Sequence, residues 1–139
     1  MTAAEMPKPG QWVLVIGSGG VALFALQFAK LLGCRVVAVS SRNEKLDRLQ
    51  ALGADLVVST ADMPEWGAAV REQVYQRSLA TISRLFVGHR TNLEAMLRAI
   101  SVHRLRPVID KVFAFDEAND AYRYFQQGDV FGKVVVDSA

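Results

Sequence analysis

The stretch WVLVIGSGGVALFALQFAKLLGCRVVAVSS, residues 12–41, decides the fold of this 139-residue chain. Its first run, Trp12–Ile16, is short, apolar and bounded by a glycine cluster, which is typical of a buried strand. The segment Val21–Leu32 is apolar on nearly every face, so it predicts a helix that is covered on both sides. A β-branched run, Arg35–Ser40, predicts the next strand. Strand, helix and strand joined by brief loops indicate parallel strands with a right-handed crossover.

Two further segments repeat this pattern. Residues 41–55 predict a helix that ends at Gly53, where a left-handed residue can stop it. One side of that helix carries three leucines, Leu46, Leu49 and Leu52. Leu56–Ser59 then predicts a third short strand. We therefore expect an α/β fold with a Rossmann-like, doubly wound parallel sheet in truncated form, whose β-α-β-α-β half spans residues 10–60.

The rest of the chain predicts further elements with weaker patterns. The first is a helix that starts around Pro64, and a strand from Arg84 (RLFVG) follows it. Next comes a helix that Thr91 and Glu94 cap and that carries the apolar stripe Leu93, Met96, Leu97 and Ile100. The last three are an extended run over 106–115, a helix capped by Asp116 and ended by Gly128, and a strand over 132–136. We expect residues 1–139 to form one truncated domain, with a shortened connection over 61–82 and a C-terminal strand and helix part over 83–139.

The overall composition argues against several classes of protein. With 51% hydrophobic and 22% charged residues, the chain has the composition of a soluble globular domain. Its formal net charge of +2 is too small and too scattered to predict binding to nucleic acid. Lys30 and Arg35 interrupt the most apolar region, so no membrane span is expected. The opening residues MTAAEMPKPG lack the features of a secretion signal.

The number and spacing of cysteine and histidine residues indicate whether the chain can bind a metal and in which cellular compartment it is expected. The one cysteine, Cys34, allows neither an internal disulfide framework nor a cysteine-rich zinc site, and its apolar neighbours predict a small buried thiol. Together with the missing signal this favours a reducing, cytoplasmic location. His89 and His103 have no partner at ligand or triad spacing, so we expect them at the surface and expect no metal site and no zinc. No nucleophile motif is present, and the catalytic residues stay unknown.

The glycine cluster carries the strongest motif. The run Gly17-Ser18-Gly19-Gly20-Val21-Ala22 fits G-x-G-x-x-G/A and lies between a predicted strand and a predicted helix, as a dinucleotide fingerprint requires. Gly17 would make the tight turn, and Gly19 would let a pyrophosphate approach the backbone. The helix N-terminus would add amide donors and a positive dipole end. The alternative is a tight strand-to-helix turn that binds nothing.

In a fold of this kind, residues at the end of the second strand contact the adenosine ribose of the dinucleotide. An acid at that point suits the 2′-hydroxyl of NAD, whereas basic residues suit the 2′-phosphate of NADP. Here the strand ends in Ser40-Ser41-Arg42, and Arg42 and Lys45 could neutralise a phosphate to which Ser41 donates. We therefore favour NADP over NAD. The alternative is that Ser41 and Glu44 form an S-x-x-E capping box, which explains both residues without a ligand.

Two long stretches resemble one known family. PGQWVLVIGSGGVALFALQFAKLLGCRVVAVSSRNEKLDRLQALGAD, residues 9–55, resembles the cofactor-binding domain of the medium-chain dehydrogenase/reductases, the superfamily of zinc-type alcohol dehydrogenases and quinone oxidoreductases. LFVGHRTNLEAMLRAISVHRLRPVIDKVFAFDEANDAYRYFQQGDVFGKVVV, residues 85–136, is similar to the C-terminal part of the same family. Together the two stretches cover most of the chain.

The resemblance implies a set of cofactor-binding residues. The glycine turn that holds the pyrophosphate in the family matches Gly19, Gly20 and Val21, which follow Gly17 and Ser18. The ribose-phosphate position matches Ser41, Arg42 and Lys45. The strand that passes near the nicotinamide matches 85–88 and ends at Gly88, and the turn beside the cofactor cleft matches Gly132 and Lys133.

The same resemblance shows where the chain departs from the family pattern. The family's N-terminal catalytic domain, with its zinc ligands where zinc is used, has no counterpart, because the chain begins about where the cofactor domain begins. Between Val74 and Ser83 the family also carries a Gly-x-Asp strand, a helix and a further strand, and here YQRSLAT stands in their place. We therefore expect an internal deletion that leaves sheet edges unpaired.

Two functional hypotheses follow. The first is an oxidoreductase of this family that moves hydride between NADPH and a carbonyl or alkene. The second is a catalytically inactive nucleotide-binding or assembly module. In both cases we expect a homodimer, or a dimer that exchanges strands, because unpaired edges and apolar faces usually find another chain. The expected partners are thus a dinucleotide and a second copy, with no nucleic acid and no membrane.

Overall fold

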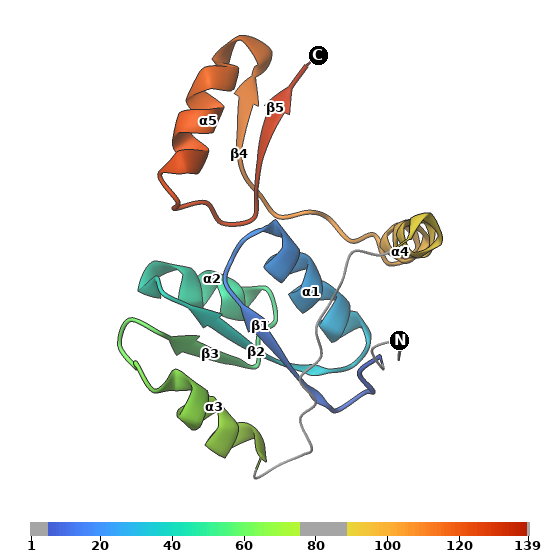
Figure 1. Cartoon of the computed structure of the whole chain (residues 1–139). Coiled ribbons are helices and arrows are strands. Elements are labelled where there is room, and N and C mark those ends of the chain that lie inside the picture. Colours follow the sequence, from blue (N-terminus) through green and yellow to red (C-terminus); the bar gives the residue numbers. More distant parts are fainter. Residues whose placement is uncertain (1–5, 76–88, 139) are drawn as a thin grey trace. The chain divides into compact units, whose positions relative to one another are not determined.

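The computed structural model describes residues 6–75 and 89–138. By their contacts the residues form two compact units, one made of 1–6 with 81–106 and the other made of 7–80 with 107–139. The second unit contains two sheets and all but one of the described helices (Figure 1). The predicted strand from Arg84, together with Gly88, lies outside the described residues.

The first sheet confirms the predicted β-α-β-α-β half. Its elements in chain order are β1 (Trp12–Ile16), α1 (Gly20–Leu31), β2 (Arg35–Ser40), the 3-10 turn η1 (Asn43–Lys45), α2 (Leu46–Ala51) and β3 (Leu56–Ser59), followed by α3 (Trp66–Tyr75). The three strands are parallel and lie in the order β1-β2-β3. Val13 pairs with Val36, and Val39 pairs with Val58, so β2 is the central strand of the three.

The central strand is buried on both faces, as a doubly wound sheet requires. On one face Val36 and Ala38 join a core with Leu26 of α1 and Leu49 of α2. On the other face a second core lies between β2, β3 and α3, and it contains Val37, Val39, Val58, Val70 and Val74. Helices α1 and α2 therefore cover one side of the sheet and α3 the other (Figure 1).

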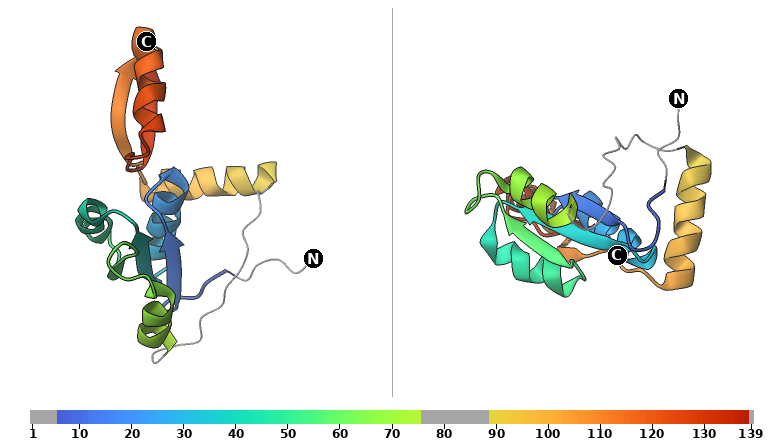
Figure 2. Two further views of the ribbon diagram at one scale, coloured as in Figure 1. Left: turned by 60° about the vertical axis from the view of Figure 1, so that its left-hand side comes forward. Right: turned by 90° about the horizontal axis from the view of Figure 1, so that it is seen from below.

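A second sheet follows near the C-terminus. It consists of β4 (Ile109–Ala114) and β5 (Lys133–Asp137), which are parallel and are connected through the 3-10 turn η2 (Phe115–Glu117) and α5 (Ala118–Gln126). Figure 2 shows α5 lying along this pair of strands. Phe113 and Ala121 are buried between the helix and the strands. Over the described residues neither of these two strands pairs with β1, because β4 and β5 pair with each other.

The helix α4 (Arg90–His103) belongs to the other unit. It begins one residue before the predicted cap Thr91, because His89 is its N-cap residue and the side-chain oxygen of Asn92 accepts from the His89 amide at 3.1 Å. Glu94 pairs with Arg90 at 2.8 Å instead of completing a capping box. Within α4 no residue is buried, and its apolar stripe of Leu93, Met96 and Leu97 is 40–52% exposed.

A similar shift occurs at the start of α5. The predicted cap, Asp116, lies inside η2, and the amide of Ala114 donates instead to the Glu117 carboxylate at 3.0 Å. A 3-10 turn precedes both α2 and α5, so α2 begins five residues after Ser41 and α5 begins two residues after Asp116. The elements that the structure describes over 6–75 and 89–138 are where the sequence predicts them.

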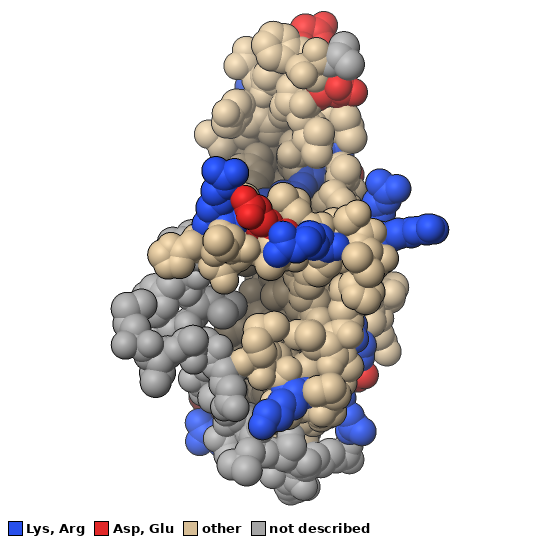
Figure 3. Space-filling view, turned by 90° about the vertical axis from the view of Figure 1, so that its right-hand side faces the viewer, with Lys and Arg blue, Asp and Glu red and all other residues tan. Residues whose placement is uncertain are grey.

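The described surface agrees with the modest net charge. On the face drawn in Figure 3, Lys and Arg side chains are interspersed with uncharged and acidic ones. None of the described helices is both long and apolar enough to cross a membrane.

Candidate functional site

A pocket of about 800 Å³ lies where the glycine turn, the end of β2 and the segment before β5 meet. Its lining residues are Ile16, Gly17, Ser18, Gly19, Gly20, Val21, Ala22, Ser40, Ser41, Arg42, Lys45, Phe125, Gly128, Val130, Gly132, Lys133 and Val134. All nine cofactor-binding residues expected from the sequence, except Gly88, line this one pocket. A volume of this size falls in the range of sites for small ligands and cofactors.

The glycine turn leaves room for a ligand at the start of α1. Gly17 has a φ of +93°, which favours glycine, and its amide donates to the carbonyl of Val39 at 2.7 Å. A Cβ atom at Gly17 or Gly19 would meet no atom within 4 Å. Gly19 is the N-cap residue of α1 and supplies no side-chain cap. The first amides of this 12-residue helix therefore face a place where an anion fits.

Lys133 adds a positive charge to that helix N-terminus. Its side chain lies so close to Gly20 that a Cβ there would collide with its outer methylenes and its ammonium group. The backbone of Lys133 is fixed, because its amide donates to the Val108 carbonyl at 3.0 Å. Two chain segments far apart in sequence thus bring an ammonium group and helix amides together. Both favour a negatively charged group such as a phosphate.

Gly132 makes this approach possible. Its φ is +96°, and a Cβ at this position would collide with the carbonyl oxygen of Val108. Its amide donates to the Ser18 carbonyl at 2.9 Å, and it forms an isolated parallel bridge with Gly19. The glycine turn after β1 and the turn before β5 are therefore joined by backbone hydrogen bonding that a larger residue would prevent.

The end of β2 does not form the capping box that the sequence offered as an alternative. Arg42, and not Ser41, is the N-cap residue of η1, and no side chain caps this turn. The buried hydroxyl of Ser40 accepts from the Arg42 amide at 3.2 Å and thereby fixes the turn after the strand. Ser41 is exposed and lines the pocket. Its hydroxyl is thus not explained by a helix cap.

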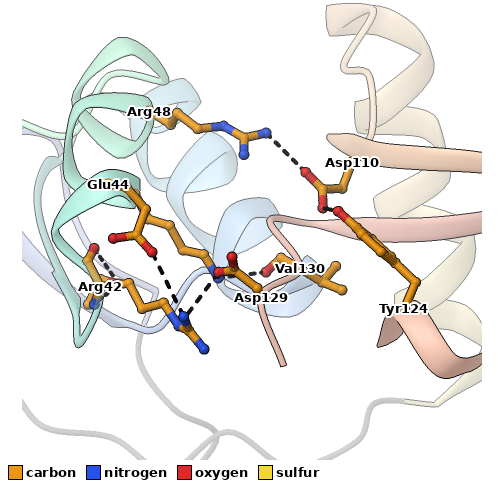
Figure 4. Close-up of polar contacts among 9 residues, drawn as sticks. Arg42, Glu44, Arg48, Asp110, Tyr124, Asp129 and Val130 are labelled. Carbon is orange, nitrogen blue, oxygen red and sulfur yellow. Dashed lines mark hydrogen bonds and ion pairs between the residues drawn. The ribbon is translucent and has the colours of Figure 1, made fainter. Parts of the chain in front are cut away.

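The two basic residues at this end share an acidic partner. Nζ of Lys45 lies 3.1 Å from Oδ1 of Asp129 and donates to the carbonyl of Val130 at 3.2 Å (Figure 4). Nε of Arg42 lies 3.5 Å from the same carboxylate oxygen. The Arg42 side chain is 43% exposed, whereas that of Lys45 is only 6% exposed. Arg42 therefore faces the pocket more openly than Lys45 does.

A second polar cluster joins α2 to the β4–β5 sheet. Asp110 accepts from Arg48 at 3.2 Å and from the hydroxyl of Tyr124 at 2.8 Å (Figure 4). Burial alone would raise the pKa of Asp110, but the hydrogen bonds from Tyr124, the Phe131 amide and Arg48 hold it below its ordinary value. The same contact with Asp110 raises the pKa of Tyr124. We call Arg48, Asp110 and Tyr124 the Asp110 cluster.

Sequence reasoning missed several residues of the site. Asp129, Asp110 and Ser40 belong to no motif, and their importance depends on partners that the fold brings close. The contact between Lys45 and Val130, for example, spans 85 positions. Gly132 did offer a signal, since a glycine directly before a β-branched strand indicates a backbone that tolerates no side chain.

Residues that could hold a metal do not come together within the described ranges. No group of three or more His, Cys, Asp or Glu side chains with metal-binding geometry occurs over 6–75 and 89–138. His89 and His103 are exposed near the two ends of α4. Cys34 is buried, as predicted, and burial raises the pKa of its thiol despite the opposing charge of Lys30. The expectation that the chain holds no zinc stays a prediction.

Comparison with known proteins identifies relatives of this chain. The family model described as zinc-binding dehydrogenase matches residues 9–136. A zinc-type alcohol dehydrogenase-like protein of Schizosaccharomyces pombe is 28% identical over 180 aligned positions, which cover 93% of this chain and 52% of the relative. Because 180 positions exceed the 139 residues of this chain, the relative carries stretches without a counterpart here. This agrees with the internal deletion that the sequence indicates.

Solved structures give the same result. A protein of Sinorhizobium meliloti 1021, provisionally named an alcohol dehydrogenase, matches with a TM-score of 0.83 and 29% identity over 94% of this chain and 52% of its own. The quinone oxidoreductase of Thermus thermophilus, which was also solved with NADPH, matches with a TM-score of 0.67 and 30% identity over 94% of this chain and 58% of its own. The chain thus spans about half the length of these relatives.

Proposed function

Because the chain belongs to the zinc-binding dehydrogenase family, we propose that it is the NADP(H)-binding part of an oxidoreductase of the alcohol dehydrogenase and quinone oxidoreductase type. The observation that carries this proposal is the pocket at the N-terminus of α1. There Gly17 and Gly19 leave open space and Lys133 adds a positive charge. These features suit a pyrophosphate, so the residues present fit a dinucleotide.

Each segment of the pocket has a distinct task in this proposal. The amides that follow Gly19 and the ammonium of Lys133 bind the pyrophosphate, while Val21, which is 81% exposed, flanks its path. The apolar side chains Phe125 and Val130 line the pocket and would contact the apolar parts of a bound dinucleotide. A bound nicotinamide would supply or accept a hydride for a carbonyl or alkene substrate. The chain itself binds and orients the cofactor.

The preference for NADP rests on the residues after β2. No carboxylate stands at the end of the strand itself, where Ser41 and Arg42 line the pocket instead. A guanidinium group suits a phosphate because it is planar and always charged. Arg42 is therefore the main expected contact of the 2′-phosphate, with Ser41 and Lys45 beside it.

Calorimetric titration with NADPH and NADH tests this function. NADPH is expected to bind more tightly, and Arg42→Ala should remove roughly 1.5–3 kcal/mol of its binding free energy, the usual worth of a hydrogen bond to a charged group. The affinity for NADH should change little in the same variant. Equal affinities for the two cofactors would overturn the preference, and binding of neither would overturn the function.

A second candidate function is a catalytically inactive nucleotide-binding or assembly module. It is favoured by the apolar side chain of Leu14 in β1, which is 43% exposed. Turnover of NADPH with carbonyl or quinone substrates separates the two candidates. Binding without turnover would favour the module. For either candidate we propose a reducing compartment, such as the cytoplasm, as the location.

A further inference from the structure

The loop between α5 and β5 places a carboxylate against the two cations at the end of β2. Oδ1 of Asp129 lies 3.1 Å from the Lys45 ammonium and 3.5 Å from Nε of Arg42 (Figure 4). Gly128 and Val130, on either side of it, line the pocket. Asp129 therefore stands beside the place where the ribose of a dinucleotide is expected, on a segment with no part in the fingerprint motif.

The Asp129 side chain is 54% exposed, but its carboxylate contacts a cation that is almost fully buried. The Lys45 side chain is only 6% exposed, and its ammonium also donates to the carbonyl of Val130 at 3.2 Å. A buried ammonium group needs a partner, so it keeps Asp129 beside it. Glu44 differs in this respect. It lies 3.9 Å from Arg42, is 63% exposed and has no such buried counterpart.

The charges of Arg42, Lys45 and Asp129 together determine how strongly this end of the pocket attracts a phosphate. Without Asp129, Arg42 and Lys45 would offer two positive charges to an anion. With Asp129, one negative charge already interacts with both of them. A 2′-phosphate must therefore displace the carboxylate from Arg42 and stay close to it, which costs Coulombic energy. A ribose with a free 2′-hydroxyl carries no such charge and meets no repulsion.

We propose that Asp129 is the residue that limits discrimination between NADPH and NADH, because its carboxylate competes with a 2′-phosphate for Arg42 and Lys45. The inference rests on the proposed cofactor function and adds a specificity-determining residue to it. In this arrangement the sequence after β2 favours NADPH, and the loop before β5 reduces that preference.

The test compares Asp129→Asn with the unchanged full chain by calorimetric titration. Asparagine keeps an oxygen that can accept from Lys45 and removes only the charge. The ligands are 2′,5′-ADP and 5′-AMP, which differ in the 2′-phosphate, and then NADPH and NADH. We expect Asp129→Asn to raise the affinity for 2′,5′-ADP and NADPH about fivefold to tenfold, since an exposed ion pair and a repulsion are removed together. Affinity for 5′-AMP and NADH should stay within about twofold.

Glu44→Gln is the matched control, because it removes the same charge beside Arg42 but leaves Lys45 and Asp129 in contact. It should raise affinity for 2′,5′-ADP clearly less than Asp129→Asn does. If Asp129→Asn does not fold, Asp129→Ser tests the same point with a hydroxyl acceptor. Unchanged or reduced affinity for 2′,5′-ADP, or an equal gain in Glu44→Gln, would overturn the inference while NADH and NADPH still bind. If neither dinucleotide binds to the unchanged chain or to any variant, the proposed function is wrong, and so is this inference.

Discussion

At the scale of single residues, two glycines of the pocket differ in what a side chain would do there. Gly19 has extended backbone angles, a φ of −79° and a ψ of 172°, and open space where a Cβ would lie. Gly132 has a φ of +96°, and a Cβ would collide with the Val108 carbonyl. The first glycine is therefore open for a ligand to approach, whereas the second is needed by the fold itself.

This difference gives a prediction with an internal control. Gly19→Val should leave the chain folded, because β-branched residues favour extended angles, and should abolish dinucleotide binding by filling the space for the pyrophosphate. Gly132→Ala should instead destabilise the chain by at least about 1 kcal/mol, because of its left-handed backbone and the collision. Urea unfolding and calorimetric titration of both variants check these results. Unchanged cofactor affinity in folded Gly19→Val would mean that the glycine turn is only structural.

The residues of the site were predictable to different degrees. Gly17 and Gly19 follow from a motif whose spacing reflects how a backbone and a helix N-terminus bind a phosphate. Arg42 follows from its position at the end of the second strand, and all three residues line one pocket. Asp129 could not be predicted, because nothing local to it indicates Arg42 or Lys45 as partners. Residues that act through the local backbone leave a sequence signal, whereas partners in long-range ion pairs do not.

At the scale of elements, hydrophobic pattern predicts strands and helices better than their ends. The buried run of β2 and the leucines of α2 indicated both elements correctly, since a sheet covered on both faces requires continuous apolar strands. The capping residues Ser41, Thr91 and Asp116 were wrong by about one turn or less. Several polar residues near a helix start can act as caps, and small energy differences decide which does. The pairing of β5 with β4 was also not predictable from either strand alone.

The Asp110 cluster links three of these elements, α2, β4 and α5, and should make stability depend on pH. The pKa of Asp110 is lowered, so its charged form is favoured by folding. Its contribution is therefore fully present above the ordinary carboxyl pKa of about 4 and is lost as the pH falls through the lowered value. Acid should weaken the attachment of β4, β5 and α5 to α2 through this cluster.

Asp110→Asn tests this dependence. At pH 7 the variant should be less stable by about 1–3 kcal/mol, since a nearly buried carboxylate loses its charge while Arg48 and Tyr124 keep their donors. Below pH 4 the difference from the unchanged chain should shrink. Asp120→Asn, which breaks an exposed pair with Arg123, is the control and should change stability by less than about 1 kcal/mol. Urea unfolding at pH 7 and pH 3 measures the stability of both variants. If Asp110→Asn differs from the unchanged chain by the same free energy of unfolding at both pH values, the proposed role of the Asp110 charge is wrong.

At the scale of the whole molecule, one edge of β1 has no neighbouring strand over the described residues. Within 6–75 and 89–138, β1 pairs only with β2, β3 pairs with the other side of β2, and β4 and β5 pair with each other. On one face of β1, Leu14 is 43% exposed, although the neighbouring Val15 on the other face is buried. Parallel sheets normally have both faces covered and their inner edges paired, so this edge differs from what the fold class requires.

We therefore predict that the chain is a dimer at micromolar concentration, with the β1 edge in or near the contact between the two copies. Leu14→Lys should shift the mass toward the monomer, because a charged side chain on an open strand opposes association. Leu31→Lys, a matched change at an exposed leucine near the end of α1, should leave the dimer intact. Sedimentation equilibrium measures the masses. The stability of a dimer whose association is coupled to folding must rise with protein concentration. A monomer whose unfolding does not depend on concentration would therefore contradict this prediction and mean that the shortened sheet is stable without a second copy.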